Sequence, residues 1–562
     1  MGKSYYSLIS LITNHNNNSN NRNNNNNKVT AFIIIVLMMV ITHHPRQCVA
    51  LSTDEIIELE CLNVPTYMFT ETLKNTIDGV VKVASIVSKF MDIFADFRDA
   101  NALNDCLDLL DLSVDELSWT LSSSQHGKGN GTGDMASDMK TWLSATLGNQ
   151  DTCLQGFDGS DSMVKGLVSG SINQLSSLVQ QILHMVHLDP QSKKGGSNSK
   201  PGPGNGARPG GGRRLLTDIS ADGFPAWMRS KDRKLLQSSG NPSPNAVVAR
   251  DGTGDFTSIM DAIHAAPSHS MDRFVIYIKK GVYDENVEIK RKFTNLMMYG
   301  DGMDVTIITG NRSFIDGWTT YRSASFAVTG AGFIAKDMTF QNTAGPEKHQ
   351  AVAFRSDSDL SALYRCAFRG YQDTLYAHAN RQFYKECTIT GTVDFMFGDA
   401  VALFQNCQIQ ARLGLPNQKN TITAQGRKDP GENTGFSLQF CNITGDETLT
   451  SSLSNSTSTY TYLGRPWKAY SRTIIMESYI SNVVRPEGWL EWNYDLYLDT
   501  LYYAEYLNNG PGSPLGSRIK WPGYHIFNSS SDALNYTVAQ FIDGNLWLPS
   551  TGVRFISGLS AV

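Results

Sequence analysis

Apolar and polar positions follow two different patterns along this chain of 562 residues. Between residues 51 and 188, apolar residues recur every three or four positions, which places them on one face of a helix. Helices of this kind bury their apolar faces by packing against one another. We therefore predict an all-α four-helix bundle over residues 51–188. The segments with this spacing are 56–62, 71–94, 102–121, 134–147 and 162–183.

From residue 237 to residue 562 the pattern changes to short β-prone runs separated by Gly and Asn. Amphipathic helices are nearly absent, which argues against an alternation of strands and helices. Cys366-Ala-Phe, Cys387-Thr-Ile and Cys407-Gln-Ile recur at spacings of 21 and 20 residues. A strand-rich repeat of this length is typical of one coil of a parallel β-solenoid, so residues 237–562 are predicted to form an all-β domain of stacked coils.

The two patterned regions are joined by residues 189–236, which begin with a stretch rich in Gly, Pro and Ser. Such a stretch cannot form a core, so a flexible linker is expected. It contains two similar tetrapeptides, Arg213-Arg214-Leu-Leu and Arg233-Lys234-Leu-Leu. A dibasic pair is often an ordinary solvated surface. Two copies in an exposed linker favour protease processing at these sites.

Residues 1–50 carry an Asn-rich stretch, an apolar run at 29–41 and the small-residue ending Cys48-Val49-Ala50. The run is short for a membrane span and suits a secretory signal peptide, with an uncleaved anchor as the alternative. Asn-x-Ser/Thr sequons fit a secreted glycoprotein. They lie at Asn130, Asn311, Asn442, Asn455, Asn528 and Asn535.

Charge and cysteine spacing limit the classes of function. A formal net charge of −5, with acidic and basic residues interspersed, gives no support for nucleic-acid binding. The eight cysteines include no pair or Cys/His cluster with the spacing of a zinc site. We predict no metal and no cofactor.

The repeat has a chemical consequence, because residues one period apart lie on the same face of adjacent coils. Asp373 and Asp394 are 21 residues apart, and Gln350 precedes Gln372 by 22. Two neighbouring carboxyls do not both ionise freely, so one should be protonated and the other anionic if a cation lies nearby. Arg465 is the predicted cation.

An acid, an anionic nucleophile and amide donors together favour acyl transfer. Trp467, two residues after Arg465, is predicted to supply an apolar or sugar-stacking wall. Taken one at a time, each of these residues has an ordinary structural explanation. Gln ladders stabilise solenoid coils, Arg–carboxylate pairs hold folds together and Trp residues fill cores.

Five motifs together resemble the plant pectin methylesterases, over a region from about Asn245 to the C-terminus. They are GVYDE (281–285), QAVAF (350–354), GYQDTL (370–375), DFMFG (394–398) and LGRPW (463–467). The helical half resembles the pectin methylesterase inhibitor-like pro-region, most clearly in ALNDCLDLL and TWLSATLGNQDTCLQGF. The resemblance implies a right-handed parallel β-helix, secretion to the cell wall and hydrolysis of galacturonate methyl esters in pectin.

The resemblance also implies roles for single residues. Asp394 would be the nucleophile and Asp373 the acid and base. Gln372, with Gln350, would stabilise the oxyanion, and Arg465 would orient Asp394. Contacts to the polysaccharide would come from Thr320, Gln350, Arg465 and Trp467. Disulfide bonds are implied for Cys387 with Cys407 and for Cys106 with Cys153.

The chain departs from the usual motifs at Phe354 and Met396, where apolar swaps leave the chemistry intact, and Cys61 has no near partner once Cys48 is removed. Expected partners are methyl-esterified homogalacturonan, a proteinaceous inhibitor and a subtilisin-like processing protease, with the enzyme a monomer. The pro-region is expected to inhibit or to assist folding until it is removed. The alternatives are a β-helix glycoside hydrolase or lyase and a non-catalytic wall-binding or inhibitor protein.

Overall fold

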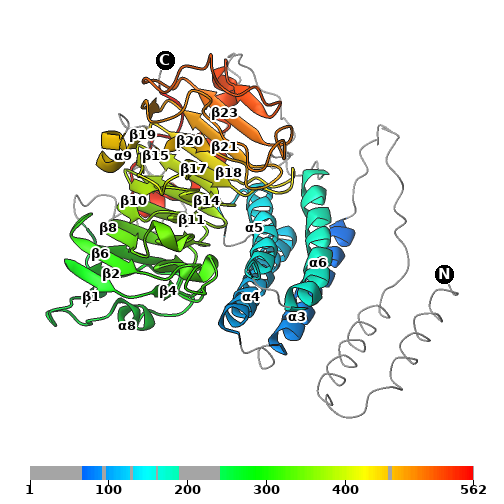
Figure 1. Ribbon diagram of the computed structural model, residues 1–562. Helices are drawn as coiled ribbons and strands as arrows, with labels where there is room; N and C mark the ends of the chain where they lie inside the picture. Colours follow the sequence, from blue (N-terminus) through cyan, green and yellow to red (C-terminus); the bar gives the residue numbers. More distant parts are fainter. Residues whose placement is uncertain are drawn as a thin grey trace, which may run out of the picture. The chain divides into compact units, whose positions relative to one another are not determined.

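The N-terminal helices form a bundle in which each helix contacts two others (Figure 1). α3 packs against α4 and α6, and α5 packs against the same two helices, so the four close into a ring. This confirms the predicted four-helix bundle. The helices are α3 (Thr66–Ser88), α4 (Phe97–His126), α5 (Met135–Gln155) and α6 (Met163–Leu188).

The computed structural model describes residues 66–90, 96–126, 131–159, 163–188, 241–452 and 459–560. All of these belong to one compact unit, Leu62–Val562. The predicted signal segment, the linker 189–236 and its dibasic pairs lie outside the described residues. Where the chain is described, no helix has the length and apolar character needed to cross a bilayer.

Helix α5 is buried on more than one side. It starts at Asp134, whose side chain accepts a hydrogen bond from Ser137 N at 3.1 Å and so satisfies one of the free amides at the helix start. The predicted Cys106–Cys153 disulfide is formed and ties α5 to α4. Polar α5 residues such as Thr141 and Ser144 are also buried, which a bundle core alone does not require.

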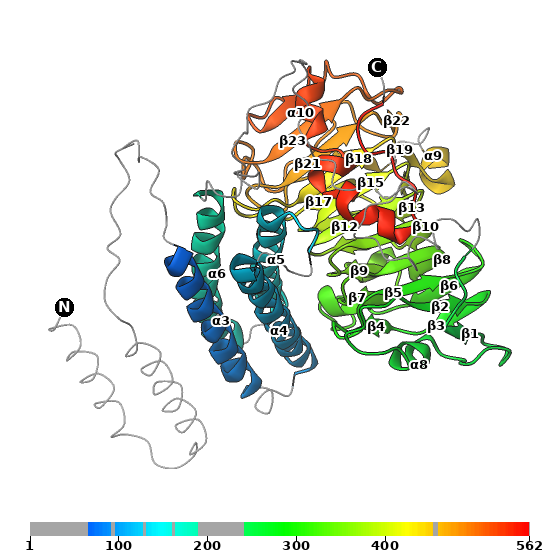
Figure 2. The ribbon, with the colours of Figure 1, turned by 180° about the vertical axis from the view of Figure 1, so that it is seen from behind.

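The C-terminal part is a parallel β-helix, as predicted, and its strands stack in chain order (Figure 2). Three faces can be traced from the strand pairings. The first holds β1 (Ala246–Val248), β2 (Phe274–Ile278), β5 (Leu296–Tyr299), β8 (Ile334–Asn342), β10 (Ser361–Arg369), β12 (Arg381–Lys385), β15 (Val401–Gln405), β18 (Gly435–Gln439), β21 (Arg472–Met476), β23 (Tyr502–Tyr506) and β24 (Tyr524–Ile526).

The long strands β8 and β10 continue into the second face, and the third face is a separate sheet. The second face adds β3 (Gly281–Asp284), β6 (Thr306–Gly310), β13 (Thr388–Gly391), β16 (Gln408–Ala411), β19 (Asn442–Gly445) and β22 (Tyr479–Ile480). The third consists of β4 (Val287–Ile289), β7 (Phe326–Val328), β9 (Phe354–Ser356), β11 (Leu375–Ala377), β14 (Met396–Gly398), β17 (Lys419–Gln425) and β20 (Tyr460–Gly464).

Short helices and 3₁₀ turns occur between and after the coils. They are α8 (Ile259–His264), η2 (Tyr321–Ser323), η3 (Pro346–Lys348), α9 (Glu447–Ser452), α10 (Ser530–Leu534), α11 (Val538–Phe541), α12 (Gly544–Trp547) and η4 (Leu548–Thr551). The C-terminal helices cover the first face, where Val538 and Trp547 pack in one cluster with Phe383 and Leu403.

The strand register confirms the period read from the sequence. Leu375 pairs with Phe354 on one side and with Met396 on the other, so the two steps around β11 on the third face are 21 residues each. Inside the coils, aromatic rings stack from one coil to the next, with the centroids of Phe326 and Phe354 5.5 Å apart. Phe354 and Met396, the two departures from the usual motifs, are both fully buried in this core.

The prediction of a Cys387–Cys407 disulfide is wrong for this structure, in which both thiols are free. The two cysteines do occupy equivalent positions on adjacent coils, because Thr388 pairs with Gln408. Each thiol donates instead to backbone carbonyls, Cys387 Sγ to Leu363 O at 3.4 Å and Cys407 Sγ to Tyr384 O at 3.5 Å. Equivalent placement on the coil therefore gives a stack of thiols without a covalent bond.

Candidate active site

The two predicted carboxyls meet on adjacent coils of the third face. Asp373 directly precedes Thr374 and β11, and Asp394 lies one coil further on, before β14. Asp373 N donates to Val393 O at 3.1 Å, which joins the two segments directly. Both residues have left-handed backbone angles, with φ of 63° and 50°, and both are buried. Non-glycine residues adopt this conformation at an energetic cost, and such residues concentrate at functional sites.

Asp394 is fixed by three side-chain hydrogen bonds. Arg465 donates from Nε to Oδ1 at 2.8 Å and from Nη2 to Oδ2 at 2.7 Å. Thr421 Oγ1 donates to Oδ1 at 2.6 Å. A bidentate guanidinium stabilises a carboxylate and sets its plane, so Asp394 is held as an oriented anion. Burial lowers the pKa of Arg465, but the hydrogen bonds to Asp394 and the charges of Asp394 and Asp373 together outweigh it, so the pKa is raised.

Asp373 has the opposite electrostatic environment. Burial raises its pKa well above the ordinary value, the neighbouring Asp394 raises it further, and Arg465 only partly offsets the two. A raised pKa favours the protonated form of a carboxyl. The site therefore pairs Asp373, whose protonated form is favoured, with Asp394, which is bound by a guanidinium.

The predicted amides lie in the same cavity, which has a volume of about 380 Å³. Gln350, Gln372 and Thr320 all line it together with the two carboxyls. Gln350 Oε1 is buried and receives no hydrogen bond from the described residues. The side-chain oxygen of Gln350 is therefore available to a bound molecule.

Aromatic side chains form one wall of the cavity. Trp467 meets Phe397 edge to face, with centroids 5.9 Å apart, and Phe397 stacks on Tyr376 at 4.1 Å. The guanidinium of Arg465 also lies 4.3 Å from the ring centroid of Trp492. Stacked rings beside a polar centre suit the apolar face of a sugar ring.

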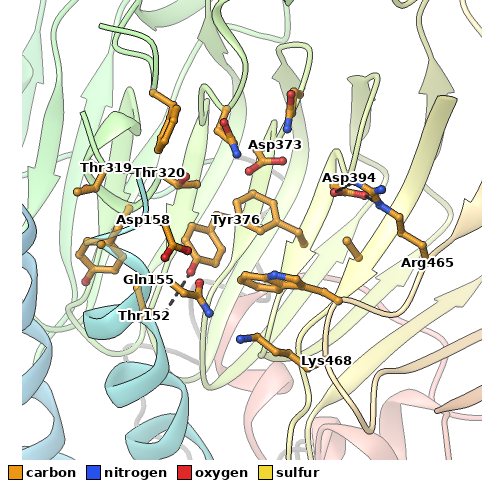
Figure 3. Close-up of a pocket in the computed structure, with 18 of the residues that line it drawn as sticks. Thr152, Gln155, Asp158, Thr319, Thr320, Asp373, Tyr376, Asp394, Arg465 and Lys468 are labelled. Atoms are coloured by element: carbon orange, nitrogen blue, oxygen red, sulfur yellow. Dashed lines mark hydrogen bonds and ion pairs between the residues drawn. The ribbon is translucent and has the colours of Figure 1, made fainter. Parts of the chain in front are cut away.

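The helical bundle contributes to the cavity as well. Thr152, Gln155, Gly156 and Asp158, at the end of α5, line it (Figure 3). Thr152 Oγ1 lies 2.8 Å from His378 Nε2 and 3.3 Å from the Tyr376 hydroxyl. The cavity is therefore closed on one side by a helix from the other half of the chain.

All the predicted site residues of the β-helix, namely Thr320, Gln350, Gln372, Asp373, Asp394, Arg465 and Trp467, line this one cavity. Sequence reasoning missed Thr421, Tyr376, Phe397 and Trp492. Thr421 lies 27 residues after Asp394 instead of 20 or 21, so the regular period does not point to it. Tyr376 and Phe397 could have been found, because they occupy paired positions on adjacent coils.

Family models match both halves of the chain. Residues 245–545 match the pectinesterase family, and residues 42–185 match the plant invertase/pectin methylesterase inhibitor family. Among solved structures, the pectin methylesterase from carrot aligns at a TM-score of 0.56 and 50% identity, over 57% of this chain and 100% of that protein. The fold and these matches define a carboxylic ester hydrolase built on a parallel β-helix.

Two relatives cover both halves together. A pectinesterase/pectinesterase inhibitor from Prunus persica is 61% identical over 505 residues, which is 90% of this chain and 91% of that protein. A probable pectinesterase/pectinesterase inhibitor from Arabidopsis thaliana is 59% identical over 91% of this chain and 97% of its own length. The chain belongs to the pectinesterase family and carries an inhibitor-like domain before the enzyme domain.

Proposed function

We propose that this chain hydrolyses the methyl esters of galacturonate units in pectin, releasing methanol and free carboxylates, with Asp394 as nucleophile and Asp373 as acid and base. The observation that carries the proposal is the environment of the two carboxyls. Asp394 is held as an anion by Arg465, whereas burial and Asp394 keep the pKa of Asp373 raised. The two acids are thereby prepared for different steps of an ester hydrolysis.

In the first step, a carboxylate oxygen of Asp394 attacks the ester carbonyl carbon. The negative charge that develops on the carbonyl oxygen is stabilised by the side-chain amides of Gln372 and Gln350. Asp373 gives its proton to the leaving methoxide, so methanol departs. An anhydride between Asp394 and the galacturonate remains, and Asp373 is now ionised.

In the second step, the ionised Asp373 takes a proton from water, and the hydroxide oxygen attacks the galacturonyl carbon of the anhydride. The bond to Asp394 breaks and both aspartates return to their starting states. The product is formed as a carboxylic acid and loses its remaining proton to solvent, which leaves the galacturonate carboxylate. Arg465 keeps its two hydrogen bonds on Asp394, which restricts the orientation of the nucleophile.

The polysaccharide chain is held by residues along the cavity. We assign contacts to Thr320, Gln350, Arg465 and Trp467, all of which line it. Trp467 is supported by its packing against Phe397, so its indole presents a fixed face to a sugar ring.

We also propose that the bundle inhibits the enzyme until it is removed. Helix α5 lines the cavity, and ion pairs and hydrogen bonds attach the bundle to the β-helix. Arg322 Nε donates to Asp105 at 2.6 Å, and Arg381 Nη1 donates to Asp138 at 2.5 Å. A polysaccharide cannot occupy the space that the end of α5 fills.

Removal of the bundle would require a cut in the linker 189–236, for which Arg213-Arg214 and Arg233-Lys234 are the proposed sites. A subtilisin-like protease suits these dibasic sequences. Secretion into the cell wall follows from the N-terminal segment and from the location of pectin, and the proposed secreted enzyme is a monomer. A separate proteinaceous inhibitor is a further proposed partner.

The function is tested with the secreted chain after cleavage in the linker, using highly methylated pectin. Methanol release without new reducing ends and without loss of viscosity is expected, whereas a glycoside hydrolase or lyase would shorten the polymer. Asp394→Asn should lower methanol release by at least about a thousandfold, because it removes the nucleophile. Retained activity in a folded Asp394→Asn protein would contradict the mechanism.

A further inference from the structure

Two lysines beside the catalytic cavity are neutralised by one carboxylate of the bundle. Lys468 Nζ lies 2.7 Å from Asp151 Oδ2, and Lys428 Nζ lies 3.8 Å from Asp151 Oδ1. Asp151 belongs to α5, and the two lysines belong to the β-helix. Burial raises the pKa of Asp151, but Lys428 and Lys468 outweigh it and hold the pKa below its ordinary value.

The lysine pair is continuous with the active site. Lys468 lines the cavity together with Asp394 and Arg465, and it points toward the α5 residues at its edge (Figure 3). A small adjoining cavity is lined by Asp151, Lys428 and Trp467. The ammonium of Lys468 is 5.4 Å from the ring centroid of Trp467. A sugar that stacks on this tryptophan would bring its substituents within reach of both cations.

We propose that Lys428 and Lys468 form a subsite for the free carboxylate of a galacturonate unit, and that Asp151 occupies this subsite as a mimic of that carboxylate while the bundle is docked. The proposal rests on the proposed function, because it assigns the polysaccharide to this cavity. Asp151 carries the same functional group as a de-esterified galacturonate. It enters from the side of the cavity that the bundle would vacate on release.

Other charges near the pair favour Lys468 as the stronger ligand. Asp399 lies in the small cavity with Lys428, and Glu432 also attracts Lys428. Burial raises the pKa of Asp399 to about 6, although hydrogen bonding to Thr434 and the charge of Lys428 both lower it. Part of the Lys428 charge is therefore shared with the β-helix, whereas the Lys468 ion pair is made to Asp151 of the bundle.

Such a subsite changes which pectin the enzyme prefers. A methyl ester gives the lysines no charge to bind, whereas a free acid supplies a carboxylate that accepts charge-assisted hydrogen bonds. Partly de-esterified stretches should therefore bind better than fully esterified ones. Fully de-esterified chains should act as competitive inhibitors.

The test measures direct binding of a fully de-esterified galacturonate hexamer by calorimetry. The solved carrot enzyme aligns over its whole length with 57% of this chain, so that structure is of an enzyme domain of this size. The catalytic part is therefore released from the secreted chain by cleavage in the linker. Lys468→Gln and Lys428→Gln are compared with Lys280→Gln, which removes an exposed lysine between β2 and β3.

Each subsite variant should bind the hexamer roughly three- to tenfold more weakly, because one partly exposed ionic contact is lost. Lys468→Arg, which keeps the charge, should stay closer to the wild type, and Lys280→Gln should match it. Added salt should weaken wild-type binding more than binding to the Lys428→Gln/Lys468→Gln double variant. The uncleaved chain, with Asp151 on the pair, should bind the hexamer least.

Equal hexamer binding by the wild type and both Gln variants would overturn the subsite, as would tight binding by the uncleaved chain. Failure of the proposed function gives a different result. In that case the wild-type protein would release no methanol but would still bind the hexamer through the two lysines.

Discussion

Asp105 should make the docking of the bundle dependent on pH. This α4 carboxyl is fully buried and accepts hydrogen bonds from Arg322 Nε at 2.6 Å and from the Thr319 hydroxyl. Burial raises its pKa from 3.8 to about 6, although Arg322 lowers it. Both partners belong to the β-helix part, so the same carboxyl becomes exposed when the bundle leaves. Its pKa then returns toward the ordinary value.

The sign of the effect follows from proton uptake. An acid with a higher pKa in the docked state binds a proton on docking. The contribution of Asp105 to the free energy of docking is therefore fully present below pH 4 and is lost as the pH rises through about 6. The change in the pKa of Asp105 from about 6 to 3.8 corresponds to about 3 kcal/mol in the free energy of docking. The docking equilibrium should weaken by about 150-fold across this window on account of Asp105 alone.

The assay compares uncleaved with cleaved protein at each pH between 4 and 7. Arg213, Arg214, Arg233 and Lys234 are replaced by Ala in the uncleaved protein to prevent processing. The ratio of methanol release, uncleaved over cleaved, reports the open fraction and cancels the pH dependence of the chemistry. Asp105→Asn removes the titrating group, so the ratio should rise less steeply with pH than in the wild type.

Other carboxyls at the interface determine the pH dependence that remains in the Asp105→Asn protein. Burial also raises the pKa of Glu116, which acts in the same direction, while Lys428 and Lys468 lower the pKa of Asp151, which acts in the opposite one. Asp78→Asn, on the exposed face of α3, is the matched control and should behave as the wild type. An Asp105→Asn protein with the wild-type pH dependence would refute the reasoning, as would a wild-type ratio that falls with rising pH.

Three further substitutions test the site and the fold. Thr421→Val removes the 2.6 Å hydrogen bond to Asp394, so kcat for methanol release should fall about tenfold. Thr421→Ser keeps the hydroxyl and should keep kcat near the wild-type value. Equal kcat values for the two variants would contradict the positioning role of Thr421. Phe354→Ala leaves a cavity between stacked rings and should lower the free energy of unfolding by about 3–5 kcal/mol in urea titrations, and a loss below 1 kcal/mol would show that the core repacks. Tyr494 has a φ of 53° and is 86% exposed, so Tyr494→Gly should raise the free energy of unfolding by about 1 kcal/mol, and a decrease would show that the tyrosine ring is held by contacts.

The period of the coils explains why the sequence alone predicted that Asp373 and Asp394 lie close together. Parallel strands in register place residues one period apart on the same face, so the spacing of Asp373 and Asp394 translates directly into proximity. The same rule places Phe354 beside Leu375 in the core. It also placed Cys387 beside Cys407, but placement alone does not decide whether a covalent bond forms.

Residues outside the regular period escaped this reasoning. The coil between Asp394 and Thr421 carries additional residues between β16 and β17, so the threonine that donates to Asp394 is displaced from the expected position in the sequence. Trp492 follows β20, the last strand of the third face. Its segment carries no repeat from which the position of the side chain could be predicted. Insertions change the sequence distance between two side chains without changing their place in the stack.

The spacing of apolar residues did not predict the docking of α5 on the β-helix, for a different reason. A helix that packs only within a bundle needs one apolar face, and its polar residues remain in solvent. In α5, Thr141, Ser144 and Thr152 are buried although they are polar, because this face lies against polar residues of the β-helix. Buried polar groups need partners, and Asn433 supplies one by donating to Thr141 at 2.9 Å. A helix that closes a cavity can therefore have the same polar face as a helix that is exposed to solvent. Only the surface on which the helix docks distinguishes a docked helix from an exposed one.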